Sequence, residues 1–579
     1  MDVAALRECR VFDTLDDAEV AEIATLVERV DVAVGDVVFG QGDVATHLYV
    51  VAAGSLEVVH DDHVAARLGA GGVFGEMALF NRQRRVATIR AVHDTTLLAI
   101  SDERLQPLVL RQRPAAVKLV QQLGALLGDR LRGLDLHLAE RAVDHDSALA
   151  VALAEYRQLR QEILSNWALA YHSLGKPGKL AVASTKPSAT AADLSVAYSP
   201  GVAEPCVAIH DDPDRAYAYT GKGHLVAVVS NGTAVLGLGN IGALASKPVM
   251  EGKAVLFKRF ADVDAFDIEV DETDPAAFVD TVVRIAPTFG GINLEDIAAP
   301  DCFWIERECK RRLDIPVMHD DQHGTAIIIG AALMNALELV GKRIEDVRVV
   351  FSGVGAAGFA SAVYLLGLGV RREHLVMTDR KGVVFTGRAG HDYLQDVASD
   401  TAARTLAEAV EGADVFVGVS AAGVLSPDML RSMAPTPIVF ALANPVPEID
   451  PGVARETRAG VIIATGRSDH PNQVNNVLAF PYIFRGALDI RATAITEGMK
   501  HAASRAIAAL AQQPVTADAG YAPGDLAFGH EALIPKPFDR RLLPEVASAV
   551  AAQGLRDGVA RTDLDLDQYA VDLREWPRQ

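Results

Sequence analysis

The segment Gly353-Val-Gly-Ala-Ala-Gly358 restricts the possible folds of this chain more than any other, because of what lies on either side of it. An apolar run, Arg348–Phe351, predicts a strand before the glycines, and the uncharged stretch after them predicts a helix. A second predicted strand, His374–Thr378, ends beside Asp379, twenty-one residues after Gly358. This order of strand, glycine turn, helix, strand and acid is the one that a Rossmann dinucleotide-binding fold requires.

The same segment predicts which residues would hold a dinucleotide. They are Gly353, Val354, Gly355, Ala356, Ala357 and Gly358 in the turn, with Asp379 and Arg380 after the next strand. The charge of Asp379 favours a ribose 2′-hydroxyl and therefore NAD, whereas Arg380 and Lys381 would suit the 2′-phosphate of NADP. We expect NAD or NADP as cofactor, with NAD slightly favoured.

A second glycine motif, Gly237-Leu-Gly-Asn-Ile-Gly242, also follows a predicted strand. Pro248 should end the helix after it within about two turns, because proline lacks the backbone donor that a helix interior needs. We therefore interpret this motif as a tight turn near the substrate.

Composition and charge restrict the location of the protein and the kinds of partner that it can bind. The stretch 349–370 carries no charge and has the length of a membrane span, but five glycines interrupt it, so a strand, a turn and a helix fit better. The 579 residues have a net charge of −21, which disfavours nucleic-acid and anionic-membrane binding. Four cysteines cannot form a disulfide framework in so long a chain, and residues 1–17 do not resemble a secretory signal. We expect a soluble, cytoplasmic protein.

The hydrophobic pattern changes along the chain and predicts several domains. In the first hundred residues, short apolar runs between glycine-rich turns predict a β-sandwich, jelly roll or barrel, with strands at Val37–Phe39, Leu48–Val51, Leu56–Val59, Ala87–Ile89 and Leu97–Ile100. Leucines at helical spacing then predict a helical connector, which could also be a dimerisation surface, at Leu119, Leu123, Leu127 and Leu131. Beyond residue 187, alternating strands and helices predict an α/β body. Its predicted strands are Leu225–Ser230, Ala254–Phe257, Ala265–Val270, Arg348–Phe351, His374–Thr378, Val415–Val419, Ile438–Ala441 and Val461–Ala464.

Within the β region, Phe74-Gly-Glu76 is followed about nine residues later by Arg85 and an Ala-Thr strand. A short helix starting at Gly75 would point backbone amides at an anion, Glu76 could accept from a ribose hydroxyl, and Arg85 offers two parallel donors to a phosphate. The alternative is that these are surface charges beside a turn. The segment resembles the phosphate-binding cassette of cyclic nucleotide-binding domains, which implies cAMP, cGMP or another nucleotide as effector. Val86 departs from the Ala or Ser usual there and leaves the ligand open.

Five further motifs occur in order in the α/β body. They are Tyr198-Ser-Pro-Gly-Val-Ala-Glu-Pro-Cys206, Ser230-Asn-Gly-Thr-Ala-Val-Leu-Gly-Leu-Gly-Asn-Ile-Gly242, Pro248-Val-Met-Glu-Gly-Lys253, Asn293-Leu-Glu-Asp-Ile297 and His319-Asp-Asp-Gln-His-Gly-Thr325. Together they closely resemble the malic enzymes of the smaller, bacterial type, over roughly two-thirds of the chain. The resemblance implies oxidative decarboxylation of L-malate to pyruvate and CO₂ with reduction of NAD(P)⁺. Together with the cyclic nucleotide-binding resemblance, it implies a fold in which a β jelly-roll precedes an α/β malic enzyme body with a Rossmann-type domain.

The resemblance also implies roles for individual residues. Carboxylates would hold Mg²⁺ or Mn²⁺ through hard oxygen ligands, at Glu295, Asp296 and Asp321. Lys253 would be the general base, kept partly neutral by burial and the metal's field, while Tyr198 would protonate the enolate and Asp320 would orient Lys253. Asparagine amides would lie near malate and the nicotinamide ribose, at Asn444, Asn475 and Asn476. Ala234 stands where larger malic enzymes have an arginine, so other residues must bind the malate carboxylate.

These patterns give expected domain bounds. They are a cyclic nucleotide-binding domain at 1–110, a connector at 111–165, a substrate and metal domain at 166–325, a Rossmann domain at 326–490 and a C-terminal helical segment at 491–579. Domain order suggests that nucleotide binding in the first domain regulates catalysis through the connector. The family resemblance implies a homodimer or higher homo-oligomer.

Three alternatives stay open at this stage. His319 and His323 could form a zinc pair, although Pro316 and Gly324 make a continuous helix there improbable and the family's ligands are oxygens. The body could be a degenerate enzyme that serves a nucleotide sensor. It could also decarboxylate oxaloacetate alone or oxidise a related 2-hydroxy acid.

Overall fold

The computed structural model describes residues 6–60 except 8, 63–75, 84–110 except 86, 113–116, 118–120, 122–123, 165, 168–173, and 176–576 except 236, 468–469, 518 and 522–526. The chain divides into two compact units, Met1–Lys179 and Leu180–Gln579. The first contains the predicted β region and the second the predicted α/β body. Most of the predicted connector, 111–165, lies outside the described residues.

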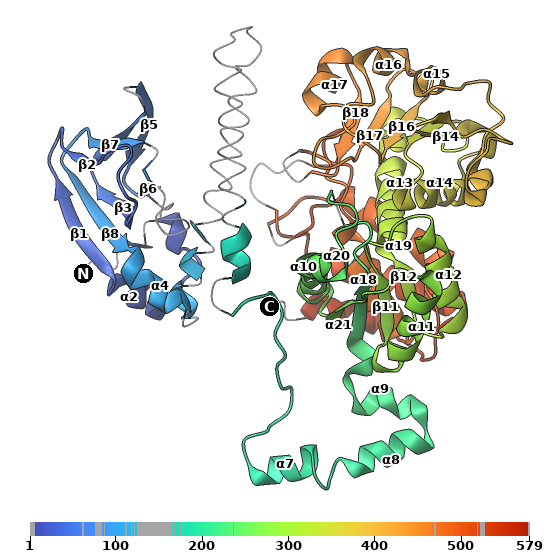
Figure 1. Cartoon of the computed structure of the whole chain (residues 1–579), viewed down its shortest axis with the longest axis horizontal. Coiled ribbons are helices and arrows are strands. Elements are labelled where there is room, and N and C mark those ends of the chain that lie inside the picture. The colour runs from blue at the N-terminus through green and yellow to red at the C-terminus, as the bar shows by residue number, and fades with distance from the viewer. Residues whose placement is uncertain are drawn as a thin grey trace. The chain divides into compact units, whose positions relative to one another are not determined.

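The first unit is built on two four-stranded sheets in which every pairing is antiparallel (Figure 1). One sheet has the order β1 (Val27–Val32), β8 (Thr95–Ser101), β3 (His47–Ala53) and β6 (Val73–Phe74), and the other has β2 (Val37–Phe39), β7 (Thr88–Ala91), β4 (Ser55–His60) and β5 (His63–Gly69). Alternating residues such as Leu48 and Val50 are fully buried, as expected when one sheet face forms a core. The two-sheet β architecture expected for a jelly roll is therefore confirmed.

One helix precedes the strands of these sheets in the sequence and another follows them. α2 (Asp17–Ala24) begins at Asp16, whose carboxylate accepts from the N–H of Glu19 while the Glu19 side chain accepts from the N–H of Asp16, a reciprocal capping box. α4 (Asp102–Leu110) follows β8 directly. Leu119 and Leu123, from the predicted leucine pattern, are fully buried in the core of this unit, whereas Leu127 and Leu131 lie outside the described residues.

The second unit contains a parallel sheet of order β10 (Asp264–Glu269), β9 (Leu225–Ser230), β11 (Gly291–Leu294) and β12 (Val317–His319). The helices α10 (Ala243–Ala261), α11 (Pro275–Ile285) and α12 (Asp301–Arg312) connect or flank its strands. Parallel strands with their carboxyl ends at one edge bring the residues after β11 and β12 together, and the site described below lies there.

Two predictions for α10 are wrong. The predicted strand Ala254–Phe257 lies inside this helix, and Pro248 does not end it. The reason is burial at helical spacing, because Met250, Ala254 and Phe257 are at most 1% exposed. A proline inside a helix costs about 3 kcal/mol. Burying side chains as large as Met250 and Phe257 recovers about 1.5–3 kcal/mol each, so the helix continues.

The predicted Rossmann sheet is present, with six strands in the order β15 (Gly382–Val383), β14 (Leu375–Asp379), β13 (Val349–Ser352), β16 (Val415–Gly418), β17 (Ile438–Ala441) and β18 (Ile462–Thr465). All neighbours are parallel except β14 and β15. The order runs outward in both directions from β13, which is the doubly wound arrangement whose switch point lies between β13 and β16. The helices that precede or connect its strands in sequence are α13 (Asp320–Val340), α14 (Ala356–Leu368), α15 (Leu406–Val410), α16 (Pro427–Ser432) and α17 (Pro451–Thr457).

Four C-terminal helices complete this unit: α18 (Phe480–Asp489), α19 (Glu497–Ala511), α20 (Leu542–Arg556) and α21 (Leu566–Glu575). They pack with α13 and α14 into the largest hydrophobic core. By length and composition α13 could span a membrane, but 67% of its most apolar stretch is buried inside the unit. It is therefore explained as a core helix. The uncharged stretch 349–370 is a strand and a helix, as predicted.

The segment before β9 forms an arm of short helices, α7 (Ala191–Ala197), α8 (Ala203–Asp211) and α9 (Ala216–Tyr219), and α7 and α8 project away from the rest of this unit (Figure 1). None of these helices has a buried residue. Short 3₁₀ helices complete the described elements: η1 (Arg10–Phe12), η2 (Pro213–Arg215), η3 (Gly221–His224), η4 (Ala286–Thr288), η5 (Arg372–His374), η6 (Asp392–Val397) and η7 (Asn476–Leu478).

Candidate active site

The three carboxylates predicted as metal ligands lie together at the carboxyl edge of the four-stranded sheet. Glu295 and Asp296 directly follow β11, and Asp321 is the second residue of α13, which follows β12. One oxygen from each lies within 4.8 Å of the others. Asp296 has a φ of +52°, a left-handed conformation that non-glycine residues seldom adopt. Its backbone N–H donates to Asp321 Oδ2 at 2.7 Å, which ties the two loops together.

Lys253, from α10, enters this acidic cluster. Its Nζ lies 2.7 Å from Glu295 Oε1 and 2.5 Å from Asp320 Oδ2, with a side chain only 10% exposed. Asn476, which follows the Rossmann sheet in sequence, donates to the same Asp320 oxygen at 3.0 Å. Asp320 therefore holds the amine from one side, as predicted for an orienting residue. The structure brings together Lys253, Asp320, Asn476, Glu295, Asp296 and Asp321.

The charges in this cluster do not balance. Burial alone would lower the pKa of Lys253, but the surrounding carboxylates, Asp320 foremost, raise it above its ordinary value. Burial and the neighbouring acids also raise the pKa of Glu295 well above its ordinary value. One ammonium thus lies among three acidic groups that favour its charged form, Asp320, Glu295 and Asp321. The neutral amine expected for a general base therefore requires an additional positive charge here.

The donor set fits a hard divalent cation. Three carboxylates without thiolate or imidazole are the ligands that suit Mg²⁺ or Mn²⁺. Asp320 Oδ1 is also buried without a hydrogen-bond partner, so the polar groups here are not fully satisfied within the described residues. Among those residues, this is the one cluster with the spacing of a metal site.

The two histidines considered as zinc ligands, His319 and His323, do not form a metal site. His319 ends β12 and is fully buried, whereas His323 lies in the first turns of α13. Both ring nitrogens of His323 already have partners: Nε2 lies 2.9 Å from Glu306 and Nδ1 lies 3.0 Å from Lys500 Nζ. The helix also continues through Gly324, contrary to the expectation from that residue. This geometry does not support a zinc pair.

Glu306 and Lys500 belong to a buried network that the sequence did not predict. Glu306 Oε1 accepts from the backbone N–H of His319 at 3.0 Å and pairs with Lys310 at 2.7 Å. Burial lowers the pKa of Lys500, while His323 and the nearby lysines hold the pKa of Glu306 well below its usual range despite its burial. The network fixes the strand end and helix start that carry Asp320 and Asp321. The one sequence feature that could have predicted this network is Lys500 itself, the only lysine in the alanine-rich helix α19.

The junction between β12 and α13 also requires glycine at position 324. A Cβ atom at this position would lie 2.1 Å from Asp320 Oδ1 and 3.1 Å from the Asn476 amide carbon. Only glycine lets the Asp320 carboxylate stand beside the first turn of α13 and still reach Lys253.

The predicted dinucleotide turn has the geometry of its class. Gly353 has a φ of +118°, and a Cβ there would lie 2.6 Å from the Val419 carbonyl oxygen. A Cβ on Gly358 would lie 2.2 Å from the Gly353 oxygen, so this glycine allows the helix to pack on the turn, whereas Gly355 faces open space. Gly355 precedes α14 and makes no side-chain cap, so the first amides of the helix, from Ala356 and Ala357, are left for an anion. Val354 accepts from the Tyr393 hydroxyl at 3.0 Å through its carbonyl oxygen.

The remaining residues predicted near the ligands are placed as follows. Asn444 lies just beyond β17, at a cis bond to Pro445, with its amide 3.4 Å from the Leu442 oxygen. Asn475 caps η7 by accepting from the N–H of Val477. Asp379 ends β14 and pairs with Arg388, a residue that was not predicted to lie near the dinucleotide, whereas Arg380 is exposed.

The other glycine motif lies at the acidic cluster. Val235, just before the motif, pairs with Gly239, and the backbone N–H of Ala234 donates to the backbone carbonyl oxygen of Asp296 at 2.9 Å. Gly237, Gly239 and Gly242 all have positive φ with open space around their Cα atoms. The motif is a tight turn beside the predicted metal ligands.

Tyr198 is not at the cluster in this arrangement. It is the residue directly after α7, on the projecting arm, and 79% of it is exposed. The predicted proton donor therefore lies on a segment that does not pack against the described core of its own unit.

In the first unit, Arg85 is 7% exposed, and Gly75 lies against it. The guanidinium donates to the carbonyl oxygens of Gly75 and His47, at 3.2 and 2.9 Å, and lies 3.9 Å above the Phe39 ring. Gly75 has a φ of +76°, and a Cβ there would lie 2.8 Å from Arg85 Nη1. Glu76 and Val86 lie outside the described residues, as does the helix expected after Gly75.

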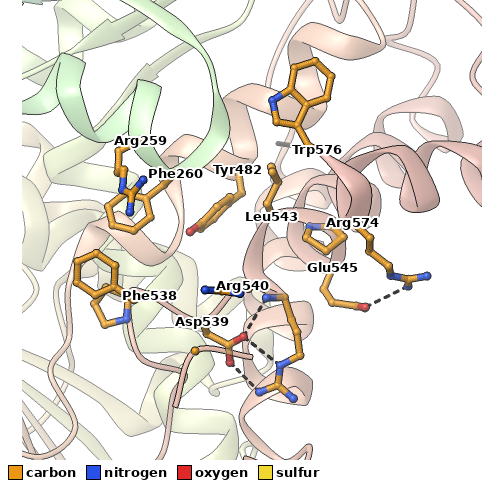
Figure 2. Close-up of a pocket in the computed structure, with 14 residues that line it drawn as sticks. Arg259, Phe260, Tyr482, Phe538, Asp539, Arg540, Leu543, Glu545, Arg574 and Trp576 are labelled. Atoms are coloured by element: carbon orange, nitrogen blue, oxygen red, sulfur yellow. Dashed lines mark hydrogen bonds and ion pairs between the residues drawn. The ribbon is translucent and has the colours of Figure 1, made fainter. Parts of the chain in front are cut away.

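A cavity of about 870 Å³ lies apart from these residues, between the end of α10, the segment before α20 and the end of α21 (Figure 2). Aromatic and basic side chains line it, among them Arg259, Phe260, Tyr482, Phe538, Arg540 and Trp576. No residue predicted for catalysis lines this cavity.

A Rossmann domain joined through Asn476 and Asp320 to a lysine-containing carboxylate cluster defines the class of the second unit, a dinucleotide-dependent α/β enzyme. Comparison with known families gives the particular family. Residues 177–310 match the malic enzyme N-terminal domain and residues 322–523 match the malic enzyme NAD binding domain. The chain belongs to the malic enzyme family. Residues 29–112 match the cyclic nucleotide-binding domain, so both predicted resemblances are confirmed.

Individual relatives agree with this. The chain is 58% identical over 397 residues to the NADP-dependent malic enzyme of Halomonas elongata, covering 68% of this chain and 94% of that protein. It is 56% identical over 422 residues to the NADP-dependent malic enzyme of Salmonella typhimurium, covering 72% of this chain but only 56% of that protein. The chain thus spans about half the length of several curated relatives. The solved malic enzyme of Pyrococcus horikoshii is 43% identical, with a TM-score of 0.66, over 71% of this chain and 96% of that one.

Enzymes of this family use NAD or NADP with a divalent metal ion, which agrees with the predicted cofactors. The named relatives include both NADP-dependent and NAD-dependent malic enzymes, so family membership does not decide between the two dinucleotides.

Proposed function

We propose that this chain catalyses the oxidative decarboxylation of L-malate to pyruvate and CO₂ with reduction of NAD(P)⁺. The observation that carries the proposal is the position of Lys253, whose amine is held by Asp320 and Glu295 at the edge of a three-carboxylate cluster. Asn476 connects this cluster to the segment that follows the dinucleotide-binding sheet.

Glu295, Asp296 and Asp321 would hold Mg²⁺ or Mn²⁺. When bound, the ion would polarise the C2 oxygen of malate, and the dinucleotide would act as the oxidant. With the ion bound, its positive charge would offset the carboxylates that now stabilise the ammonium form, and Lys253, once it has lost its own proton, would accept that of the C2 hydroxyl. Asp320 and Asn476 fix the direction of the amine. Asn444 and Asn475 lie on loops beyond the sheet, where neutral amides can contact the malate carboxylate and the nicotinamide ribose.

The proton delivered to C3 would come from Tyr198. Because this side chain is exposed on the arm, it reaches an active site only after the arm packs against a body, either its own or that of a second copy. The arm also exposes apolar side chains that such packing would cover, among them Val182, Leu194, Val196 and Val207. We therefore propose a homodimer or higher homo-oligomer, in which the arm contacts the second copy.

The first unit is proposed to regulate the second through a cyclic nucleotide, cAMP or cGMP, that binds at Gly75 and Arg85. The proposal rests on the cyclic nucleotide-binding family match and on the buried guanidinium, which is held in a fixed direction by two carbonyl oxygens. A guanidinium held in this way can present paired donors to a phosphate.

The enzyme activity is tested by following NAD(P)H formation from L-malate with Mn²⁺, beside oxaloacetate and tartrate as competing substrates. Oxidation of malate with release of pyruvate is the expected result. If the protein decarboxylates oxaloacetate but does not oxidise malate, the proposed reaction is wrong and it is an oxaloacetate decarboxylase. If it acts on none of the three substrates, the catalytic body is degenerate.

Regulation and assembly are tested on the same protein. Titration of cAMP and cGMP into the malate assay should change the rate or KM, and no change with either would leave the first unit without the proposed role. Light scattering should give at least the mass of a dimer. Mixing Tyr198→Phe with Lys253→Met would restore activity if Tyr198 serves a second copy, and would restore none if each arm serves its own body.

A further inference from the structure

The charge of Asp379 is the reason why the sequence predicts NAD over NADP. In the structure, this carboxylate forms an ion pair with Arg388. We propose that Arg388 neutralises Asp379, so that the dinucleotide site prefers the 2′-phosphorylated cofactor NADP. The inference rests on the proposed function, which it deepens by assigning the cofactor and a residue that determines it.

Asp379 ends β14, the strand beside the glycine turn, where an acidic residue normally accepts hydrogen bonds from the ribose diol. Here both carboxylate oxygens have donors. Arg388 Nη1 lies 3.0 Å from Oδ1, Arg388 Nη2 pairs with Oδ2, and the backbone N–H of Lys381 donates to Oδ1 at 2.7 Å. Burial opposes ionisation of Asp379, but Arg388 lowers its pKa, so the acid is charged and paired. Its charge is no longer available to repel a phosphate.

Arg388 is held in this position by the loop that follows β14. Its Nη1 also donates to the carbonyl oxygens of Gly382 and Val383, at 3.1 and 3.0 Å, and its side chain is 11% exposed. Gly382 has a φ of +98°, and a Cβ there would lie 2.1 Å from the Arg404 oxygen, so the loop conformation depends on glycine. The ion pair is therefore part of the folded loop, not a chance contact between two surface side chains.

The local charge favours a phosphate. Residues 379–388 contain Asp379 and three basic residues, Arg380, Lys381 and Arg388, which gives a net charge of +2. Arg380 and Lys381 are exposed directly after the strand end. A phosphate monoester carries a charge of about −1.5 to −2 at neutral pH, and arginine and lysine are its usual partners. A ribose hydroxyl gains nothing comparable from these cations.

Calorimetric titration of NADP and NAD into the full chain, without malate, tests the inference. Wild type should bind NADP at least tenfold more tightly than NAD. The double variant Arg380→Gln, Lys381→Gln should lose about 10- to 100-fold in NADP affinity, the range expected for charge-assisted hydrogen bonds, and should keep its NAD affinity within about threefold. Arg431→Gln, which removes an exposed arginine of α16 in the same domain, is the matched control and should change neither affinity.

A second variant tests whether the paired Asp379 carboxylate still binds the ribose, without removing the arginine that holds the loop. Asp379→Asn keeps the shape of the side chain and should leave NAD affinity nearly unchanged, because the paired carboxylate does not hold the ribose. A loss of more than tenfold in NAD affinity would mean that Asp379 binds the diol and would overturn the inference. Tighter binding of NAD than of NADP by wild type would also overturn it while leaving the proposed function intact. Binding of neither dinucleotide would refute the proposed function itself.

Discussion

Arg85 in the first unit and Lys253 in the second are both buried cations, but they are held by different kinds of group. Arg85 donates to two backbone carbonyl oxygens and lies over an aromatic ring. Lys253 is held by carboxylates that change their own charge with protonation or ligand binding. A guanidinium is charged at every accessible pH, whereas an amine is not.

The difference suits each cation to a different task. A permanently charged group in a rigid setting can anchor an anion without changing its own state. An amine among carboxylates can gain or lose its proton when a cation joins the cluster, as a general base must. The predictions below test this contrast, beginning with the largest effect.

Removal of the amine should have the largest effect. Lys253→Met should lower kcat for malate about 10²- to 10⁴-fold, the usual contribution of a positioned acid or base. It should also lower the melting temperature, because Asp320 and Glu295 lose a buried counter-charge. Lys258→Met, on the same helix but exposed and paired with Asp262 and Asp264, is the control and should keep its activity. Activity of Lys253→Met within threefold of wild type would contradict the assigned role.

Removal of one acid from the cluster should weaken metal binding. Asp321→Asn keeps an oxygen that can accept from the Asp296 N–H but loses a charged ligand, so Mn²⁺ affinity should fall at least tenfold, measured by calorimetry. Asp301→Asn, at the exposed start of α12, should bind Mn²⁺ as wild type does. Equal affinities of wild type and Asp321→Asn would place the metal elsewhere.

Removal of the guanidinium in the first unit should affect only the nucleotide. Arg85→Gln should bind cAMP or cGMP about 10- to 100-fold more weakly, with the rate in the absence of nucleotide unchanged. Arg85→Lys should recover only part of this, because an ammonium lacks the paired donors. Arg84→Gln, exposed and one residue away, is the control for nucleotide binding. Loss of basal activity in Arg85→Gln alone would show that the two cations are not independent.

The smallest effect concerns a third cation, Lys247, on the same helix as Lys253. It is 43% exposed, 2.5 Å from Asp267 and 3.4 Å from Glu269. Burial, together with the Asp267 carboxylate, raises the pKa of Glu269 to about 7 from an ordinary value of 4.5. Since the folded-state pKa is raised, the stability that this group contributes is complete below pH 4.5 and is lost as the pH rises through 7.

Glu269→Gln should therefore unfold at nearly the same temperature as wild type at pH 5 and at a higher temperature at pH 8. The gain should be ~1 kcal/mol, because Lys247 is partly exposed to solvent and already offsets part of the charge. Thermal denaturation at several pH values measures it. A constant difference between the two proteins across this range would contradict the shifted pKa.

Much of the fold could be predicted because local patterns agreed with it. The glycine turn at 353–358 predicted the switch point of the six-stranded sheet, since Gly353 and Gly358 each meet a different steric demand there. The strand predicted at Ala254–Phe257 failed because a four-residue apolar run fits a buried strand and a buried helix equally well. Only the spacing of Met250, Ala254 and Phe257 distinguished the two.

The site was predictable where residues lie near one another in sequence and much less where they do not. Glu295 and Asp296 are adjacent, and Asp321 follows the neighbouring strand, so sheet order alone joins them. Lys500 reaches His323 across 177 residues, and Arg388 reaches Asp379 from a loop without a recognisable motif. The exposed place of Tyr198 could not be predicted, because no sequence pattern states whether an arm packs on its own body.

Gly324 also sets a limit for engineering. The 2.1 Å separation between a hypothetical Cβ and Asp320 Oδ1 means that even alanine would push the orienting carboxylate away from the amine. A saturation library at this position should return one functional amino acid. Attempts to evolve the enzyme toward other 2-hydroxy acids should therefore leave position 324 untouched and search the loops facing it instead.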